Sequence, residues 1–277
     1  LRVVSNAWAD GRETYLTTID LDNPDNLEVL ATLNFERASG DTLFATRFDG
    51  PRAYVVTFFV IDPLFVLDLS DPENPEITGE LEVPGWSTHI EPRGDVLVAL
   101  GVDDTNGRKV SVSLFGVPLD DPPTLIDRAS FGEEWSWSSA YSDVKSFAVL
   151  DDVLAVPFSG WNDKVGGYDR LQFVEWSPAG LDVQGFVDLQ GALVRTLAYG
   201  NNYYGLTQEE LATVAGDDLA APEVTNRLVL AENSTDFLPL DKGLGVEVIT
   251  RYDTGVTKLR SHNLPLKAED DVELELG

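Results

Sequence analysis

Residues 42–85 read TLFATRFDGPRAYVVTFFVIDPLFVLDLSDPENPEITGELEVPG, and they decide the fold. This stretch predicts four short strands, at Thr42–Phe48, Ala53–Val60, Leu64–Leu69 and Ile77–Val83. Each is rich in β-branched, aromatic and aliphatic residues and is too short for a helix. Turn chemistry separates the strands at Asp49-Gly50, Asp62-Pro63 and Asp71-Pro72, since proline presets φ and aspartate accepts a backbone hydrogen bond. The stretch therefore predicts a four-stranded antiparallel unit, which needs neighbouring units to cover its faces.

The same pattern recurs along the chain. Residues 19–33 (IDLDNPDNLEVLATL) align without a gap onto residues 67–81 (LDLSDPENPEITGEL), 48 positions later, and residues 115–122 form a looser third copy. A period of about 45–50 residues is what four strands and their turns occupy. We therefore predict a single all-β domain, a β-propeller of about six visible four-stranded blades in a ring of six to eight. The predicted units are approximately 1–35, 42–85, 87–130, 137–188, 194–232 and 235–277.

Some parts of this repeat are less regular. The first unit supplies only three strands, so its inner strand is missing and must come from upstream residues or from the C-terminus. The fourth contains a long loop at 159–169, which we expect on the surface. In the fifth, residues 208–219 are compatible with a short helix as well as with strands.

Composition limits the possible partners. The chain has 277 residues, 43% of them hydrophobic, and a net charge of −29 from 48 acidic and 19 basic residues. This charge disfavours nucleic acid and anionic lipid surfaces, and no window is apolar enough for membrane insertion. The acidic surface is typical of a secreted protein or of one that lives in high salt, and calcium capture is the alternative meaning of the charge. Cysteine is absent, which excludes disulfides and thiolate chemistry.

A family resemblance enters at RAYVVTFFVIDPLFVLDLSDPENPEITGELEVPGWSTHIEP (52–92). This stretch closely resembles the secreted prokaryotic β-propeller domain family, whose blades carry LVIVD-like repeats. The resemblance continues through VSVSLFGVPLDDPP (110–123) and SSAYSDVKSFAVLDDVLAVPF (138–158), and covers about residues 13–204. It implies a propeller, export, additional sequence on the N-terminal side, and no established enzymatic activity. Where the family often has Asp-His-Lys, this chain has Asp143-Val144-Lys145, so a site that relies on that histidine has no match here.

Four basic residues are the candidate site. When the units are aligned on the start of their second strands, one basic residue falls on each of four inner strands. Inner strands line the central channel of a propeller, so these side chains would form a positive ring able to bind a carboxylate, phosphate or acidic peptide. The alternative is structural: they pair with Asp49, Glu91, Asp143 and neighbours and tie adjacent blades together. The four residues are Arg47, His89, Lys145 and Arg195.

Other constellations carry weaker predictions. Asp103, Asp104 and Asn106 crowd one hairpin tip and are a low-priority calcium site, because their spacing does not match an EF-hand. Trp86, Trp135, Trp137 and Trp161 would either stack on sugars or peptides or fill gaps between blades. No residues form a recognisable catalytic motif, and two histidines are too few for a multi-histidine metal centre.

We therefore predict a secreted or extracytoplasmic propeller, at the cell surface or in the periplasm, that acts as a binding or protein-interaction scaffold. Its partner is a protein or an acidic small molecule, and no cofactor other than a possible calcium ion is expected. The alternative is a propeller hydrolase that acts on a polysaccharide or ester through channel carboxylates.

Overall fold

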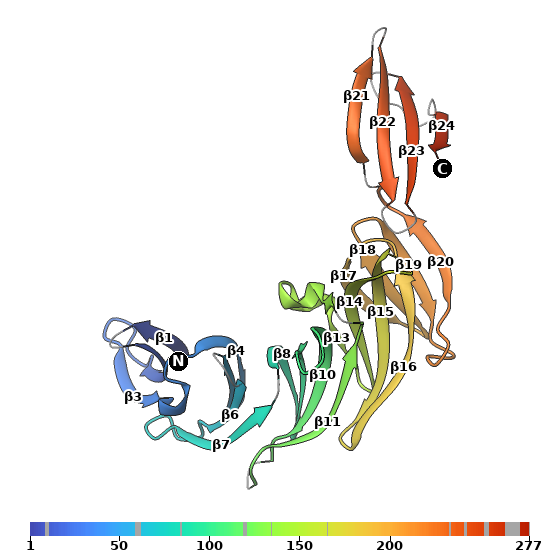
Figure 1. Cartoon of the computed structure of the whole chain (residues 1–277). Coiled ribbons are helices and arrows are strands. Elements are labelled where there is room, and N and C mark those ends of the chain that lie inside the picture. The colour runs from blue at the N-terminus through green and yellow to red at the C-terminus, as the bar shows by residue number, and fades with distance from the viewer. Residues whose placement is uncertain are drawn as a thin grey trace. The chain divides into compact units, whose positions relative to one another are not determined.

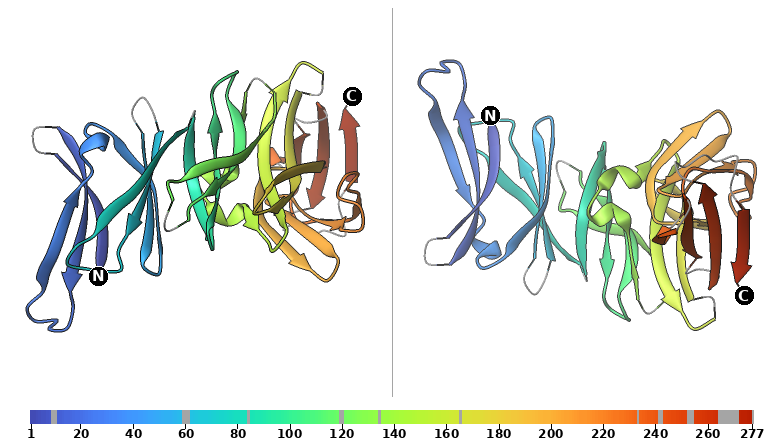
Figure 2. Two further views of the ribbon diagram at one scale, coloured as in Figure 1. Left: turned by 90° about the horizontal axis from the view of Figure 1, so that it is seen from below. Right: turned by 90° about the horizontal axis from the view of Figure 1, so that it is seen from above.

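The chain is built of strands, as a computed structural model of it shows. The structure describes residues 1–8, 11–58, 62–83, 85–118, 121–133, 135–164, 166–232, 234–240, 243–251, 255–263 and 272–276. In these residues the strands form six sheets, and the helical elements are three short 3₁₀ turns. The prediction of an all-β chain with four-stranded antiparallel sheets is confirmed. In five of these sheets the strands lie in chain order (Figure 1, Figure 2).

The chain divides into two compact units. The first contains Leu1–Trp137, Val149–Leu154 and Val174–Val183, and the second contains Ser138–Ala148, Ala155–Phe173 and Gln184–Gly277. Three whole sheets belong to the first unit and two to the second. The remaining sheet has residues in both.

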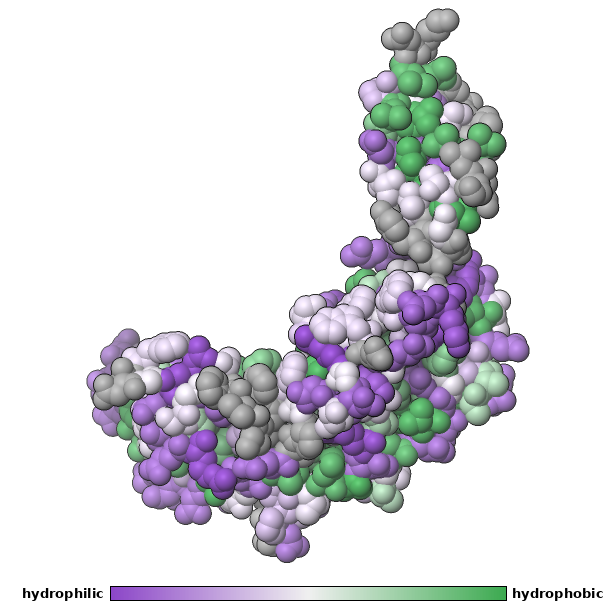
Figure 3. All heavy atoms as spheres, viewed as in Figure 1, coloured by the Kyte–Doolittle hydropathy of each residue, from purple (hydrophilic) through white to green (hydrophobic). Residues whose placement is uncertain are grey.

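The first unit begins with a three-stranded sheet, as predicted, and continues with two four-stranded sheets. Hydrophilic side chains cover much of the surface visible in Figure 3. The strands are β1 (Arg2–Trp8), β2 (Arg12–Asp20) and β3 (Glu28–Asn34); β4 (Thr42–Asp49), β5 (Arg52–Phe58), β6 (Asp62–Asp68) and β7 (Glu76–Val83); and β8 (Trp86–Arg93), β9 (Val96–Asp103), β10 (Lys109–Gly116) and β11 (Thr124–Phe131), with the 3₁₀ turn η1 (Glu36–Ala38) after β3.

Side chains of β5 alternate between two cores, because successive residues of a strand point to opposite faces. Ala53 and Val55 pack toward the first sheet in a cluster with Leu16 and Phe35. Tyr54 and Val56 pack toward the third sheet, in a second cluster. The middle sheet is thus buried on both faces, as its sequence predicts.

The fourth sheet departs most from expectation. Its order is β12-β14-β15-β16, with β13 also paired to β14. The prediction that Lys145 lies on an inner strand is wrong: residues 144–146 form a 3₁₀ turn, and only Ala148–Val149 of this segment are extended. The predicted long loop at 159–169 is largely strand. The elements are β12 (Ser136–Trp137), η2 (Ser139–Tyr141), η3 (Val144–Ser146), β13 (Ala148–Val149), β14 (Val153–Asn162), β15 (Gly166–Ser177) and β16 (Gly180–Leu189).

Two four-stranded sheets belong to the second unit. Residues 210–215 form a strand, so the helical alternative at 208–219 is wrong. The ring of Tyr203 lies 5.0 Å from that of Phe173 on β15, measured between centroids, and this contact joins two sheets within the unit. The strands are β17 (Leu193–Tyr199), β18 (Asn202–Thr207), β19 (Glu210–Ala215), β20 (Val224–Val229), β21 (Ser234–Leu240), β22 (Leu244–Arg251), β23 (Val256–Asn263) and β24 (Val272–Leu276).

Candidate functional site

The first strands of four sheets share one irregularity. In β4, β8, β17 and β21 the register with the next strand shifts by one residue, near the start of the strand. The extra residue is a β-bulge, which bends the strand and redirects the side chains that follow it. The shifts fall between Leu43 and Ala45, Ser87 and His89, Leu193 and Arg195, and Ser234 and Asp236.

This bulge corrects the alignment of the four predicted site residues. His89 and Arg195 are equivalent, because each follows the bulge and each pairs with the fifth residue of the next strand, Leu100 or Leu206. Arg47 lies two residues farther along and pairs with Tyr54, so its counterpart in the next sheet is Glu91, which pairs with Val98. Arg47, His89 and Arg195 thus lie on the first strands of three sheets, but Arg47 does not share the repeat position of the other two. Lys145 lies on η3 and not on an inner strand.

In the first unit, three basic side chains converge on one carboxylate. Glu91 Oε2 lies 3.2 Å from Arg47 Nη2 and 3.7 Å from His89 Nε2, and Glu91 Oε1 lies 2.8 Å from Arg93 Nη1. We call Arg47, His89, Glu91 and Arg93 the Glu91 cluster. With His89 neutral it holds two guanidinium charges and one carboxylate, so it is locally positive in a strongly acidic chain.

His89 is the member that can change its charge near neutral pH. Burial lowers the pKa of His89 below its ordinary value, and the nearby Arg47 acts in the same direction, while Glu91 opposes them. Burial dominates because removing a charged imidazolium from water is costly. The imidazole is therefore held in its neutral form to a lower pH than a free histidine.

A small pocket lies beside Arg47. It has a volume of about 210 Å³ and lies between the bulged ends of β4 and β8. Arg47 supplies the guanidinium of its lining, and 47% of the Arg47 side chain is exposed. The pocket is lined by Phe44, Ala45, Thr46, Arg47, Thr88, His89 and Ile90.

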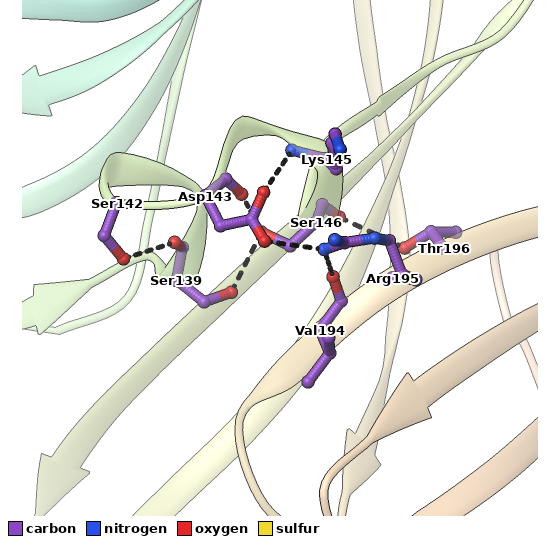
Figure 4. A network of polar contacts seen from close by, with 8 residues as sticks. All are labelled: Ser139, Ser142, Asp143, Lys145, Ser146, Val194, Arg195 and Thr196. Atoms are coloured by element: carbon purple, nitrogen blue, oxygen red, sulfur yellow. Dashed lines mark hydrogen bonds and ion pairs between the residues drawn. The ribbon is translucent and has the colours of Figure 1, made fainter.

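The other two predicted site residues meet in the second unit. Arg195 Nη1 lies 2.8 Å from Asp143 Oδ2, and the backbone N–H of Lys145 donates to Asp143 Oδ1 at 3.2 Å (Figure 4). These contacts lower the pKa of Asp143, with the Arg195 hydrogen bond as the largest cause. The Lys145 side chain is exposed, and no ion pair or hydrogen bond of its ammonium is found among the described residues. We call Asp143, Lys145 and Arg195 the Asp143 cluster.

The contacts of the two clusters agree with the structural alternative in part. Arg47 joins β4 of one sheet to Glu91 on β8 of the next, and Arg195 of β17 reaches Asp143 before η3. The predicted partners Glu91 and Asp143 are confirmed as ion-pair partners. Among the described residues, Asp49 forms no ion pair. Arg47 keeps 47% of its side chain exposed despite its ion pair, so pairing does not close it off from a ligand.

At the hairpin tip, the candidate calcium ligand Asp103 is already satisfied. Its Oδ1 accepts hydrogen bonds from the Thr105 N–H at 3.0 Å and the Thr105 hydroxyl at 2.6 Å, and its Oδ2 accepts one from Ser130 at 2.6 Å. Burial acts to raise the pKa of Asp103, but these hydrogen bonds outweigh it and hold the pKa below its ordinary value. Among the described residues, no three His, Cys, Asp or Glu side chains are grouped as metal ligands would be.

The predicted role of the tryptophans as gap fillers holds only for some of them. Trp135, Trp137 and Trp161 are each more than 40% exposed. The guanidinium of Arg108 lies between two indole rings, 5.4 Å from the centroid of Trp86 and 5.2 Å from that of Trp135. This stack fixes the connection after β11 against the β9–β10 hairpin.

A second pocket is acidic and is formed away from β4 and β8. It measures about 640 Å³, and its lining includes Asp127 of the last strand β11, Asp182 of the last strand β16, and Trp176. The Leu181 N–H donates to Asp127 Oδ2 at 2.9 Å, so part of this carboxylate is already engaged. The carboxylates of this pocket include those of last strands of their sheets and of the segment 175–182.

Two contacts between neighbouring sheets were not anticipated from the sequence. Arg52, at the start of β5, donates to the carbonyls of Gly94 at 3.4 Å and Val117 at 3.1 Å, and Arg2, at the start of β1, donates to those of Gly50 and Leu69. Arg2 and Arg52 stand 50 positions apart, close to the repeat period, and this spacing could have predicted that the two arginines play equivalent roles. No helix among the described residues has both the length and the apolar character to cross a membrane.

Comparison with known proteins agrees with this architecture. An uncharacterised protein of Methanocaldococcus jannaschii is 39% identical over 109 residues, which cover 39% of this chain and 17% of that protein. An uncharacterised protein of Archaeoglobus fulgidus is 40% identical over 126 residues, 43% of this chain and 20% of that protein. The chain therefore aligns with only a fifth or less of the length of these relatives. A family model described as "Beta propeller domain" matches residues 1–219, and the chain thus belongs to the β-propeller domain family.

Proposed function

We propose that this chain is a non-enzymatic binding scaffold that holds an anionic ligand at the inner strands β4 and β8. One observation carries the proposal: half-exposed Arg47 borders a pocket that His89 also lines. A ligand oxygen would pair with the Arg47 guanidinium. The local excess of positive charge would favour an anion there although the chain as a whole repels anions.

The chemistry of the site favours binding over proton transfer. A guanidinium stays protonated throughout the physiological pH range, so Arg47 and Arg93 can hold a charge but cannot exchange a proton. Arginine also offers several N–H donors in one plane, which suits an oxyanion. The proposed contribution of Arg47 and His89 is therefore to orient and hold a ligand.

The proposal extends to Lys145 and Arg195 in the second unit. Asp143 uses its two oxygens for the Arg195 side chain and the Lys145 backbone, and the Lys145 ammonium remains exposed. This cluster, like the Glu91 cluster, carries one more positive than negative charge. It provides a second anion-binding group on the same scaffold.

The proposed location is outside the cytoplasm, at the cell surface or in the periplasm. The acidic surface and the resemblance to a secreted family with LVIVD-like repeats support it. Fractionation of cells that express the natural protein, with an antibody to this domain, would test it. Recovery in the cytoplasmic fraction alone would overturn this part of the proposal.

The test of the ligand site is a pair of arginine variants. We would titrate the protein with propionate, succinate, sulfate and phosphate by isothermal titration calorimetry. Arg47→Ala should abolish binding and change the melting temperature by less than about 3 °C, since an exposed ion pair contributes at most about 1 kcal/mol. Arg37→Ala is the matched control, because Arg37 is also an exposed arginine in ion pairs, with Glu80 and Glu82. A large loss of stability in Arg47→Ala, with no binding by the parent protein, would support the purely structural role instead.

A further inference from the structure

Glu91 occupies the place on Arg47 that an incoming anion would need. Its Oε2 faces Arg47 at 3.2 Å and His89 at 3.7 Å, while Oε1 faces Arg93 at 2.8 Å. The shorter of these contacts is to Arg93, and Arg47 and His89 line the pocket whereas Arg93 does not. Glu91 can therefore release Arg47 without losing its closest partner.

The charge balance of the cluster defines the ligand class. Arg47 and Arg93 together exceed Glu91 by one positive charge when His89 is neutral. A single carboxylate would neutralise this excess, whereas a phosphate at neutral pH carries up to two negative charges and would also meet Glu91. The volume of about 210 Å³ admits a group of a few heavy atoms, since a water molecule takes about 30 Å³ of liquid.

We propose that Glu91 is an intramolecular competitor for a carboxylate ligand, which enters the pocket and displaces Glu91 from Arg47. This inference rests on the proposed function and adds the ligand class and the control of the site. In the bound state the ligand carboxylate lies between Arg47 and His89, and Glu91 remains on Arg93. The carboxylate comes either from a free small acid or from an acidic side chain of a polypeptide.

The test compares two carboxylate probes on two variants. The probes are propionate and a hexapeptide with blocked ends and one internal glutamate, titrated by calorimetry. Glu91→Gln should tighten binding about three- to fivefold, the effect of removing one part-exposed ion pair that competes with the ligand. If Glu91→Gln binds only propionate more tightly, the ligand is a free acid. If Glu91→Gln binds the peptide more tightly, the ligand is an acidic side chain.

The matched control is Glu80→Gln. Glu80 is an ion-paired glutamate of similar exposure, 18% against 20% for Glu91, on β7 of the same unit. It lies three strands from β4, or about 14 Å, where its charge is largely screened. The affinity of Glu80→Gln for either probe should stay within about 1.5-fold of that of the parent protein.

A second variant keeps the inference testable if Glu91→Gln unfolds. Arg93→Gln leaves Glu91 with Arg47 and His89 only, so competition increases and the affinity should fall. If Arg47→Ala abolishes binding but Glu91→Gln leaves it unchanged or weaker, the competitor role is refuted and the ligand site stands. If neither probe binds the parent protein or Glu91→Gln, the ligand site itself is refuted.

Discussion

Replacing Gly79 with alanine tests how closely neighbouring sheets approach. A β-carbon added to Gly79, on the last strand β7, would lie 2.3 Å from Cδ of Pro123, which precedes β11 of the next sheet. Carbon atoms that are not bonded prefer a separation of about 3.5–4.0 Å, so one of the two strands must move by more than about 1 Å. Overpacking of this kind costs about 1–3 kcal/mol.

The expected loss in the free energy of unfolding is therefore about 1–2 kcal/mol, because Gly→Ala recovers about 0.4–1 kcal/mol by restricting the unfolded chain. Thermal unfolding followed by circular dichroism should show a melting temperature lower by about 2–8 °C. Gly11→Ala is the control, since nothing lies within 4 Å of its added β-carbon, and it should be neutral or slightly stabilising.

A double variant identifies the cause. Combining Gly79→Ala with Pro123→Ala removes the proline ring that the new methyl group meets, so the pair should be less destabilised than the sum of the single variants. Gly185 repeats the arrangement against Pro222 Cδ, also at 2.3 Å, and should respond in the same way. If Gly79→Ala is as stable as Gly11→Ala, the close approach of the two strands is refuted.

Three further outcomes follow from named contacts. Arg52→Ala should lower the free energy of unfolding in urea by about 1–3 kcal/mol, because it leaves the Val117 carbonyl unpaired, and equal stability would contradict the role of this contact. The pKa of His89 is lowered in the folded state, so the unfolded chain binds a proton first as the pH falls, and the folded state should lose stability below about pH 6.5. In melting curves taken from about pH 7.5 to 5, His89→Gln should reduce this fall of the melting temperature with pH. A chelator should leave the melting temperature unchanged, because Asp103 already accepts three internal hydrogen bonds, and a fall would reinstate the calcium site.

Strands and turns could be predicted from the sequence where local chemistry decides them. The four strands of residues 42–85 are present, and the Asn106-Gly107 hairpin has its glycine at positive φ (81°). Pro63 was expected to break a strand, yet it is the second residue of β6, a position that tolerates proline because it lies at the strand's start. Boundaries of this kind depend on pairing partners that a single segment does not reveal.

Side-chain partnerships were predicted less well, because they depend on the register between strands. The alignment of units relied on predicted strand starts, which fall at different positions of β5, β9 and β18, and it therefore placed Arg47 beside His89 and Arg195. The register instead makes Arg47 equivalent to Glu91, and the two residues become ion-pair partners across neighbouring sheets. Lys145 was misplaced for a related reason: Asp143 and Ser138 cap short 3₁₀ turns where a strand was expected.

Successive sheets of the first unit are joined by the same kinds of contact. Arg2 and Arg52 clamp the following sheet in the same manner, and the Gly79–Pro123 contact recurs as Gly185–Pro222 in the second unit. A surface that fits the sheet before it also fits any copy of that sheet. Duplication or deletion of a whole repeat within a gene would therefore create no new type of junction, and members of the family can differ in repeat number while every junction stays compatible.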